Sequence, residues 1–176
     1  MFIGIDCGLS GAICTMKGDD IAIMSMPINV NKEGERKLDL KTLKSLFTIY
    51  KTALVGIEYA PPGAYDIRGR VQGVGSVYKV GLNYGLLLGL MEGIGVTYEV
   101  IAAGRWQKHL LNVVKTGTTK ARSLEKAKEL YPNVKLIPYK GRVESHNFSD
   151  ALLIAHYVKM EHQSQKGLGL YAKLPT

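Results

Sequence analysis

Three short apolar segments follow one another at the start of the chain, with only a tight, glycine-containing turn between each pair. These segments are residues 2–6, 12–16 and 21–26. Consecutive strands joined by short turns predict an antiparallel meander. Helical and strand patterns then alternate, which predicts parallel strands added by right-handed crossovers. We therefore expect an α/β fold with one mixed sheet of five strands, flanked by helices on both faces. The later elements are expected as helices at residues 40–50, 74–93, 120–131 and 145–163 and as strands at residues 53–59 and 96–101, with a polar loop through Asn31 and Glu35 before the first helix.

The composition is that of one ordinary globular domain. The chain has 176 residues, of which 46% are hydrophobic and 22% are charged, and this length suits a single core. We expect one domain over residues 1–166, followed by a flexible tail at residues 167–176. Cys7 and Cys14 are the only cysteines, which excludes a disulfide scaffold and a cysteine-rich zinc site and favours a reducing compartment.

Membrane association is not expected. The most apolar stretch, residues 80–96, is interrupted by Asn83 and Glu92 and falls short of the roughly 20 apolar residues that span a bilayer. The first residues have no basic segment of the kind that begins a signal peptide. We therefore expect a cytoplasmic location.

The positive charge of the chain is concentrated in one segment. The net charge is +8, from 23 basic and 15 acidic residues. Residues 1–104 contain ten of each sign and residues 143–176 contain three of each, whereas residues 105–142 contain ten basic residues and only Glu125 and Glu129. Such a local excess is typical of a surface that binds a polyanion. The alternative is an ordinary solvated helix face.

Two predicted strands end in the same way, with an acid after a glycine and an isoleucine. Residues 4–6 are Gly-Ile-Asp and residues 56–58 are Gly-Ile-Glu, so the two-residue period of a strand places both acids on the glycine face. If these strands are neighbours, Asp6 and Glu58 raise each other's pKa unless a cation lies between them. A single acid could be a solvated strand end, but the pair favours a hard divalent cation with oxygen ligands.

A third acid, Asp150, begins an apolar helical segment. His146 and Asn147 precede it by four and three residues and share its helix face. These three side chains could bind a metal ion or position a water. The alternative, compatible with the first, is that Ser145 or Asn147 caps the helix while Asp150 interacts with its positive end.

The predicted helix at residues 74–93 carries four glycines on one face. Gly81, Gly85, Gly89 and Gly93 recur every four residues, and each costs a helix roughly 0.5–1 kcal/mol relative to alanine. Close approach of another backbone must offset this cost. We expect packing on the sheet of the same chain, with a helix contact between two copies as the alternative.

Five segments, in order along nearly the whole chain, match motifs of a known family. They are FIGIDCGLSG at residues 2–11, the Ile57-Glu58 strand end, the glycine-rich helix, RWQK at residues 105–108, and SDALLIA at residues 149–155. With these motifs the chain resembles the RuvC-type Holliday junction resolvases of bacteria and phages. The resemblance implies an RNase H-like fold and a homodimer formed through the helix around Gly81 to Gly93. It also implies two Mg²⁺ or Mn²⁺ ions per active site and paired nicking of four-way DNA junctions, in a bacterial cell or a phage-infected host.

By this resemblance, Asp6, Glu58 and Asp150 match the metal-binding carboxylates of the family. A fourth metal position, usually Asp or His, is Asn147 here, and Cys7 replaces the usual proline. Because asparagine is a neutral oxygen ligand that cannot act as a base, we expect weaker metal binding there. His146 could take over a catalytic role by a small rotation of the helix.

The expected DNA contacts lie in two regions. The basic residues from Arg105 to Arg122 would hold phosphates flanking the cut, and the loop after Glu58 would reach the crossover point, where Tyr65 could stack on a base. The residues proposed for DNA binding are Lys108, Lys115, Lys120, Arg122, Arg105, Arg68, Arg70 and Tyr65.

Two other functions remain open from the sequence. The first is a junction-binding protein with impaired cleavage, because Asn147 replaces a metal ligand. The second is an actin-like nucleotide-binding phosphotransferase, since residues 2–11 also resemble the phosphate loop of that class. The length argues against the second function, because that class closes two domains over its nucleotide, whereas 176 residues hold only one.

Overall fold

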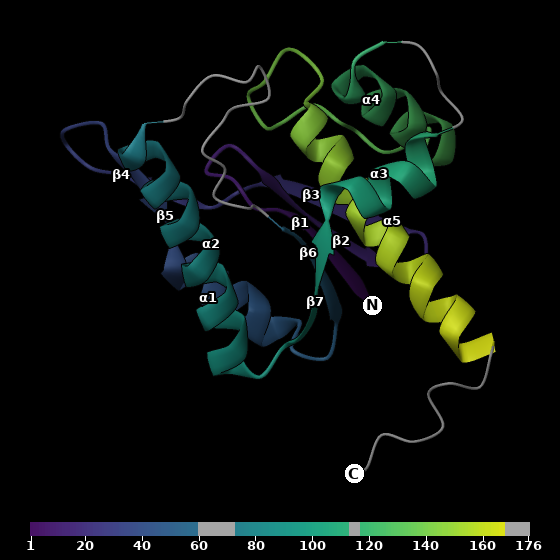
Figure 1. Cartoon of the computed structure of the whole chain (residues 1–176), viewed down its shortest axis with the longest axis horizontal. Coiled ribbons are helices and arrows are strands. Elements are labelled where there is room, and N and C mark those ends of the chain that lie inside the picture. Colours follow the sequence, from purple (N-terminus) through teal and green to yellow (C-terminus); the bar gives the residue numbers. More distant parts are fainter. Residues whose placement is uncertain (60–72, 113–116, 168–176) are drawn as a thin grey trace.

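The structure is a computed structural model that describes residues 1–59, 73–112 and 117–167. Its centre is a five-stranded sheet in the order β3-β2-β1-β6-β7 (Figure 1). The first three strands pair antiparallel, and β6 and β7 are added parallel to β1. This mixed sheet confirms the predicted fold class. The strands are β1 (Phe2–Asp6), β2 (Ala12–Lys17), β3 (Asp20–Ser25), β6 (Leu54–Tyr59) and β7 (Thr97–Ala102).

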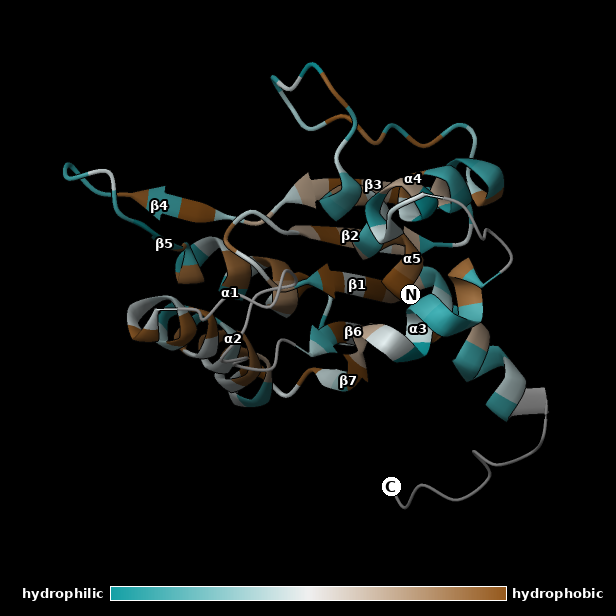
Figure 2. Ribbon diagram, turned by 45° about the horizontal axis from the view of Figure 1, so that its top comes forward, coloured by the Kyte–Doolittle hydropathy of each residue, from teal (hydrophilic) through white to brown (hydrophobic). Residues whose placement is uncertain are grey.

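Helices cover both faces of the sheet, as expected, and the two faces form separate cores. On one face, Ile3, Ile5 and Ile57 pack with Phe47 and Met91 of the helices. The other face packs against a second cluster that includes much of the C-terminal helix. Figure 2 shows the hydrophobic strands lying between the two helical layers. The first layer contains α1 (Leu40–Ile49) and α2 (Val74–Ile94), and the second contains α3 (Ala103–Leu111), α4 (Thr119–Leu130) and α5 (His146–Gly167).

Gly4 and Gly56 allow α5 to lie unusually close to the sheet. A Cβ atom on Gly4 would fall 2.1 Å from the Ala151 carbonyl oxygen and 2.4 Å from the Ala155 amide nitrogen. A Cβ atom on Gly56 would meet Val158 at 2.4 Å. Because side chains alternate along a strand, Asp6 and Glu58 share this α5 face, whereas the isoleucines between glycine and acid point the other way.

A hairpin of two strands and a helix were not expected from the sequence. Residues predicted as a polar loop form a small hairpin, β4 (Ile28–Val30) with β5 (Arg36–Leu38), which projects from the body of the molecule (Figure 1). Helix α3 follows β7 directly, and its first residue is preceded by Ala102, whose side chain makes no capping hydrogen bond. The sequence therefore lacks, at this point, the polar N-cap residue by which the start of a helix is usually predicted.

The expectation that the glycines of α2 pack on the chain's own sheet is wrong. Among the residues that the structure describes, a Cβ atom added to Gly81, Gly85, Gly89 or Gly93 would meet no atom within 4 Å. Helix α2 instead turns Leu87 and Met91 toward the core. The described part of the chain therefore leaves the glycine face of α2 open.

Within the described residues, no helix is both long enough and apolar enough to cross a membrane. This result agrees with the polar interruptions of α2 at Asn83 and Glu92.

Substitution of Gly4 by alanine should destabilise the protein strongly, because the new methyl group would collide with helix backbone that cannot rotate away. We expect a loss of about 3 kcal/mol in the free energy of unfolding, measured by urea denaturation. Gly104→Ala is the matched control, since a Cβ there meets nothing within 4 Å and should change stability by less than about 1 kcal/mol. Equal stability of the two variants would contradict the close packing of α5 on β1.

Candidate functional site

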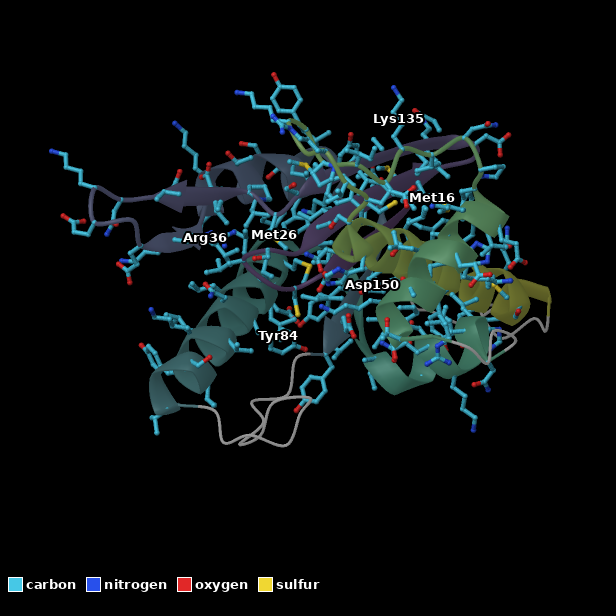
Figure 3. The ribbon with its side chains drawn as sticks, turned by 90° about the horizontal axis from the view of Figure 1, so that it is seen from above. Met16, Met26, Arg36, Tyr84, Lys135 and Asp150 are labelled. Carbon is cyan, nitrogen blue, oxygen red and sulfur yellow. The ribbon has the colours of Figure 1, made fainter. Side chains whose placement is uncertain are left out.

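Three acids from three elements meet at the carboxyl ends of β1 and β6. Asp6 is the last residue of β1, and Glu58 follows directly after the parallel pair Ile5–Ile57 that joins β1 to β6. Asp150 lies in the second turn of α5, which packs across β1. In the view of Figure 3, Asp150 lies near the middle of the molecule rather than at its edge. The two strand ends and the close approach of α5 thus define one site.

Burial raises the pKa of all three carboxyl groups, and the neighbouring acids raise the pKa of Asp6 and Glu58 further. Burial, and secondly the charge of Asp150, raise the pKa of Asp6 to about 7, against the opposing effect of Lys120. Burial, then Asp6 and Asp150, raise the pKa of Glu58 to about 7. Burial raises the pKa of Asp150 to about 6, although Ser123 and Lys120 act in the opposite direction. A divalent cation would relieve this repulsion.

The donor set fits a hard cation such as Mg²⁺ or Mn²⁺, because all three acids supply oxygen atoms. In the part of the chain that the structure describes, however, no group of three His, Cys, Asp or Glu side chains is already arranged around one point as a metal site. A cation bound by all three acids would therefore require their side chains to come closer together than they are in this structure.

Ser123 fixes the orientation of Asp150. Its hydroxyl group donates a short hydrogen bond to Asp150 Oδ1, and its oxygen lies 2.9 Å from the Ser149 hydroxyl oxygen. Ser149 Oγ also lies 2.9 Å from the carbonyl oxygen of His146, to which it can donate. Both serines are completely buried, in contrast to the rest of the polar side chains of α4 and α5. Sequence reasoning missed Ser123, because nothing distinguishes a serine in a basic helix until its neighbour is known, and it noted Ser149 only as part of the motif at residues 149–155.

The loop after Asp6 is held from two sides. Gly8 N–H donates to the Asp6 carbonyl oxygen at 3.1 Å, which turns the chain immediately after the acid. Asn147 Nδ2 donates to the carbonyl oxygen of Ser10, while the guanidinium of Arg36 donates to the carbonyl oxygen of Leu9 at 2.6 Å. The amide nitrogen of Asn147 is therefore engaged in positioning this loop, and only its oxygen could face a metal ion. Arg36 was not identified from the sequence.

Cys7 and His146 are both uncharged near neutral pH. Burial, with the nearby charges of Asp6 and Glu58, raises the pKa of the Cys7 thiol to about 12. This thiol donates to the Glu58 carbonyl oxygen at 3.0 Å, so Cys7 links the two strand ends and is no nucleophile. Burial and the charge of Lys120 lower the pKa of His146, which keeps its imidazole neutral.

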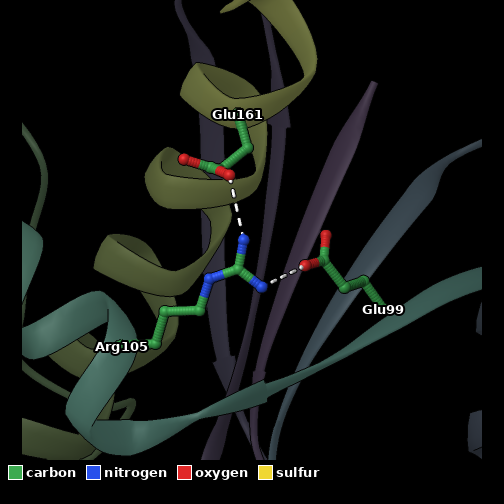
Figure 4. A network of polar contacts seen from close by, with 3 residues as sticks. All are labelled: Glu99, Arg105 and Glu161. Atoms are coloured by element: carbon green, nitrogen blue, oxygen red, sulfur yellow. Dashed lines mark hydrogen bonds and ion pairs between the residues drawn. The ribbon is translucent and has the colours of Figure 1, made fainter. Parts of the chain in front are cut away.

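Two of the basic residues proposed for DNA contact, Lys120 and Arg105, differ in whether their charge is paired with an acid. Lys120 is exposed, and its charge acts on Asp6, Asp150 and His146, so it lies beside the carboxylates. Arg105 is instead ion-paired with Glu99 at 3.3 Å and with Glu161 at 3.1 Å (Figure 4).

The other proposed DNA contacts divide into two groups. Lys108 is exposed on α3, and the half-buried Arg122 donates to the Thr119 hydroxyl oxygen on α4 at 3.3 Å. The remaining candidates, Tyr65, Arg68, Arg70 and Lys115, lie outside the described residues.

Comparison with known proteins identifies the fold. No model of a protein family matches the chain, and no curated protein matches it. Among solved structures, the chain is similar to RuvC of Thermus thermophilus, with a TM-score of 0.53 and 16% identity over 91% of this chain and 96% of that chain. It is also similar to T. thermophilus RuvC in complex with a Holliday junction substrate, with a TM-score of 0.51 and 14% identity over 90% and 95% of the two chains. The chain therefore has the RNase H-like fold of RuvC.

Replacing Asp6 with asparagine should stabilise the protein at high pH. The pKa of Asp6 is 3.8 in a model peptide and about 7 in the fold, so between these values the folded state retains a proton that the unfolded state has released. Stability therefore falls as pH rises from 4 to 7, and Asp6→Asn removes this loss. We expect the variant to exceed the wild type at pH 8 by about 1 kcal/mol or more, and by less at pH 4.

Urea denaturation at both pH values, without divalent ions, measures this difference. Asp19→Asn is the control, because Asp19 is exposed on a turn. An Asp6→Asn effect that does not change with pH would contradict the burial of the charge.

Proposed function

We propose that this protein is a structure-selective endonuclease that resolves four-way DNA junctions by metal-dependent hydrolysis of phosphodiester bonds. The observation that carries the proposal is the convergence of Asp6, Glu58 and Asp150 on one site, where each carboxyl group has a raised pKa. The fold supports it, because one similar structure is a RuvC bound to a Holliday junction substrate.

In this proposal the three carboxylates hold Mg²⁺ or Mn²⁺, as two ions per site. Bound ions of this kind lower the pKa of a water molecule and stabilise the leaving oxygen. Ser123 holds Asp150 in place through its hydrogen bond, and the clamped loop after Asp6 limits the movement of that acid. Lys120 supplies a positive charge beside the acids, where the substrate phosphate must come close to negatively charged groups.

The rest of the DNA interface is proposed to follow the basic segment. Lys108 and Arg122 lie on α3 and α4, in the same helical layer as Lys120, and Lys115 belongs to the same segment of sequence. Tyr65, Arg68 and Arg70 would reach the crossover point from the loop after β6. Contacts of this kind position DNA without selecting its sequence.

A homodimer through α2 would give two active sites for the two nicks of a resolution reaction. The open glycine face of α2, together with Leu40, Leu82, Leu86 and Leu90, lines a shallow apolar groove. Leu82 is 45% exposed and Leu86 37% exposed, although both are apolar. Glycines that destabilise a helix and contact none of the described residues are explained if a second helix packs against them.

The wild-type protein should nick a mobile four-way junction in the presence of Mg²⁺ or Mn²⁺ and should not cut a linear duplex of the same sequence. Asp6→Asn or Glu58→Gln should lower the nicking rate by about 100-fold or more without weakening junction binding, because removing negative charge does not reduce the attraction of phosphates. A gel-based nicking assay and a binding assay measure the two effects. Equal cleavage of junction and duplex would exclude the resolvase proposal.

The second candidate, a junction-binding protein with impaired cleavage, is tested by Asn147→Asp in the same assays. That candidate requires the variant to cut at least about tenfold faster than the wild type. We expect slower cutting, because an aspartate would place a carboxylate oxygen against the Ser10 carbonyl oxygen that now accepts a hydrogen bond from Asn147.

Sedimentation velocity tests the dimer. The wild type should sediment as a dimer at micromolar concentration, and Leu86→Glu should shift it to monomer by placing a charge in the glycine groove. Ile49→Glu is the matched control, since Ile49 is 73% exposed on α1 and outside this groove. Dissociation by both variants, or by neither, would exclude α2 as the dimer contact.

A further inference from the structure

The connection between α4 and α5 is an ordered loop that the proposed function does not yet use. We call residues 136–145 the 136–145 loop. Ser145 N–H donates to the Leu136 carbonyl oxygen at 2.9 Å, so the two ends of the loop are joined. Leu136 is buried in the core, and Glu144 is paired with Lys128 of α4 at 2.6 Å. These anchors fix where the tip of the loop lies.

The tip is a tight turn that exposes an aromatic ring. Gly141 N–H donates to the Pro138 carbonyl oxygen at 2.8 Å, which places Tyr139 and Lys140 at the centre of the turn. Lys140 has a left-handed backbone conformation with φ of 61°, and a Cβ on Gly141 would meet the Pro138 oxygen at 2.9 Å. Tyr139 is 91% exposed, the largest exposure among the large hydrophobic side chains that the structure describes.

The groups around Tyr139 are positively charged. Lys140 Nζ lies 5.5 Å from the centre of the Tyr139 ring, and Arg142 is exposed two residues further on. The acid of this loop, Glu144, is already paired with Lys128. An aromatic face beside unneutralised cations is a combination that binds unpaired bases and their phosphates.

The 136–145 loop lies at the same end of the molecule as the three carboxylates. It leads directly into His146 and Asn147, and Figure 1 shows it above the beginning of α5. On its β3 side, the cleft that Tyr139 lines also contains Asp19 and Asp20, which would repel a phosphate. This cleft is therefore unfavourable for a phosphate.

We propose that Tyr139 stacks on an unpaired or distorted base of branched DNA near the cut, while Lys140 and Arg142 hold the phosphates that flank it. This inference rests on the proposed function and assigns to that function a base-contacting element outside the segment between Arg105 and Arg122. The contact would distinguish branched DNA from a continuous duplex, because only branched DNA offers an accessible base face.

Binding of the full-length protein to a four-way junction and to a linear duplex, at one salt concentration and without divalent ions, tests the inference. Tyr139→Ala should weaken junction binding about tenfold and leave duplex binding unchanged, whereas Tyr139→Phe should bind like the wild type because it retains the ring. Val143→Ala is the matched control, since Val143 is a 76% exposed side chain of the same loop. A 2-aminopurine base placed next to the crossover should lose fluorescence on binding the wild type but not Tyr139→Ala.

Unchanged junction binding by Tyr139→Ala would overturn the inference, as would an equal loss by Tyr139→Phe or an equal loss of duplex binding. A change of oligomeric state in Tyr139→Ala with unchanged DNA binding would also overturn it and would assign the loop to a protein contact. Failure of the proposed function is a different result, since the wild type itself would then fail to nick the junction in the presence of Mg²⁺ or Mn²⁺.

Discussion

The close contact between α5 and β1 is the constraint on which the rest of the structure depends. Gly4 lies directly beneath the backbone of Ala151 and Ala155, where any side chain would hold the helix away from the sheet. This contact places Asp150 near the ends of β1 and β6, although it is more than 90 residues from Glu58 in sequence. A larger separation would admit water between the acids, and their repulsion and raised pKa values would decrease.

The site combines groups that destabilise the fold with groups that hold them in place. Asp6, Glu58 and Asp150 lose solvation and repel one another, which opposes folding at neutral pH. Lys120 and the buried Ser123 partly offset this cost at Asp150. Strain of this kind is expected where a protein keeps a charged site ready for a ligand of opposite charge.

Much of this arrangement could be predicted from residue patterns. The alternation of strand side chains places Asp6 and Glu58 on one face, and the glycines at positions 4 and 56 mark the face that the helix approaches. Helix periodicity alone could not predict which element packs against Gly81 to Gly93. The four-residue spacing shows that the glycines share one face of the helix, but it does not identify the element that contacts this face. The roles of Ser123 and Asn147 depend on hydrogen bonds between segments remote in sequence, which no local pattern reveals.

The central claim is that the three carboxylates form a site for divalent cations. Calorimetric titration of Mn²⁺ into the wild type and into Asp6→Asn, Glu58→Gln and Asp150→Asn at pH 8 tests it most directly. The account predicts that Mn²⁺ binds the wild type and that each substitution weakens binding by about tenfold or more, since each removes one oxygen-rich anionic ligand. Undiminished Mn²⁺ binding by all three variants, or no binding by the wild type with or without junction DNA, would contradict the account.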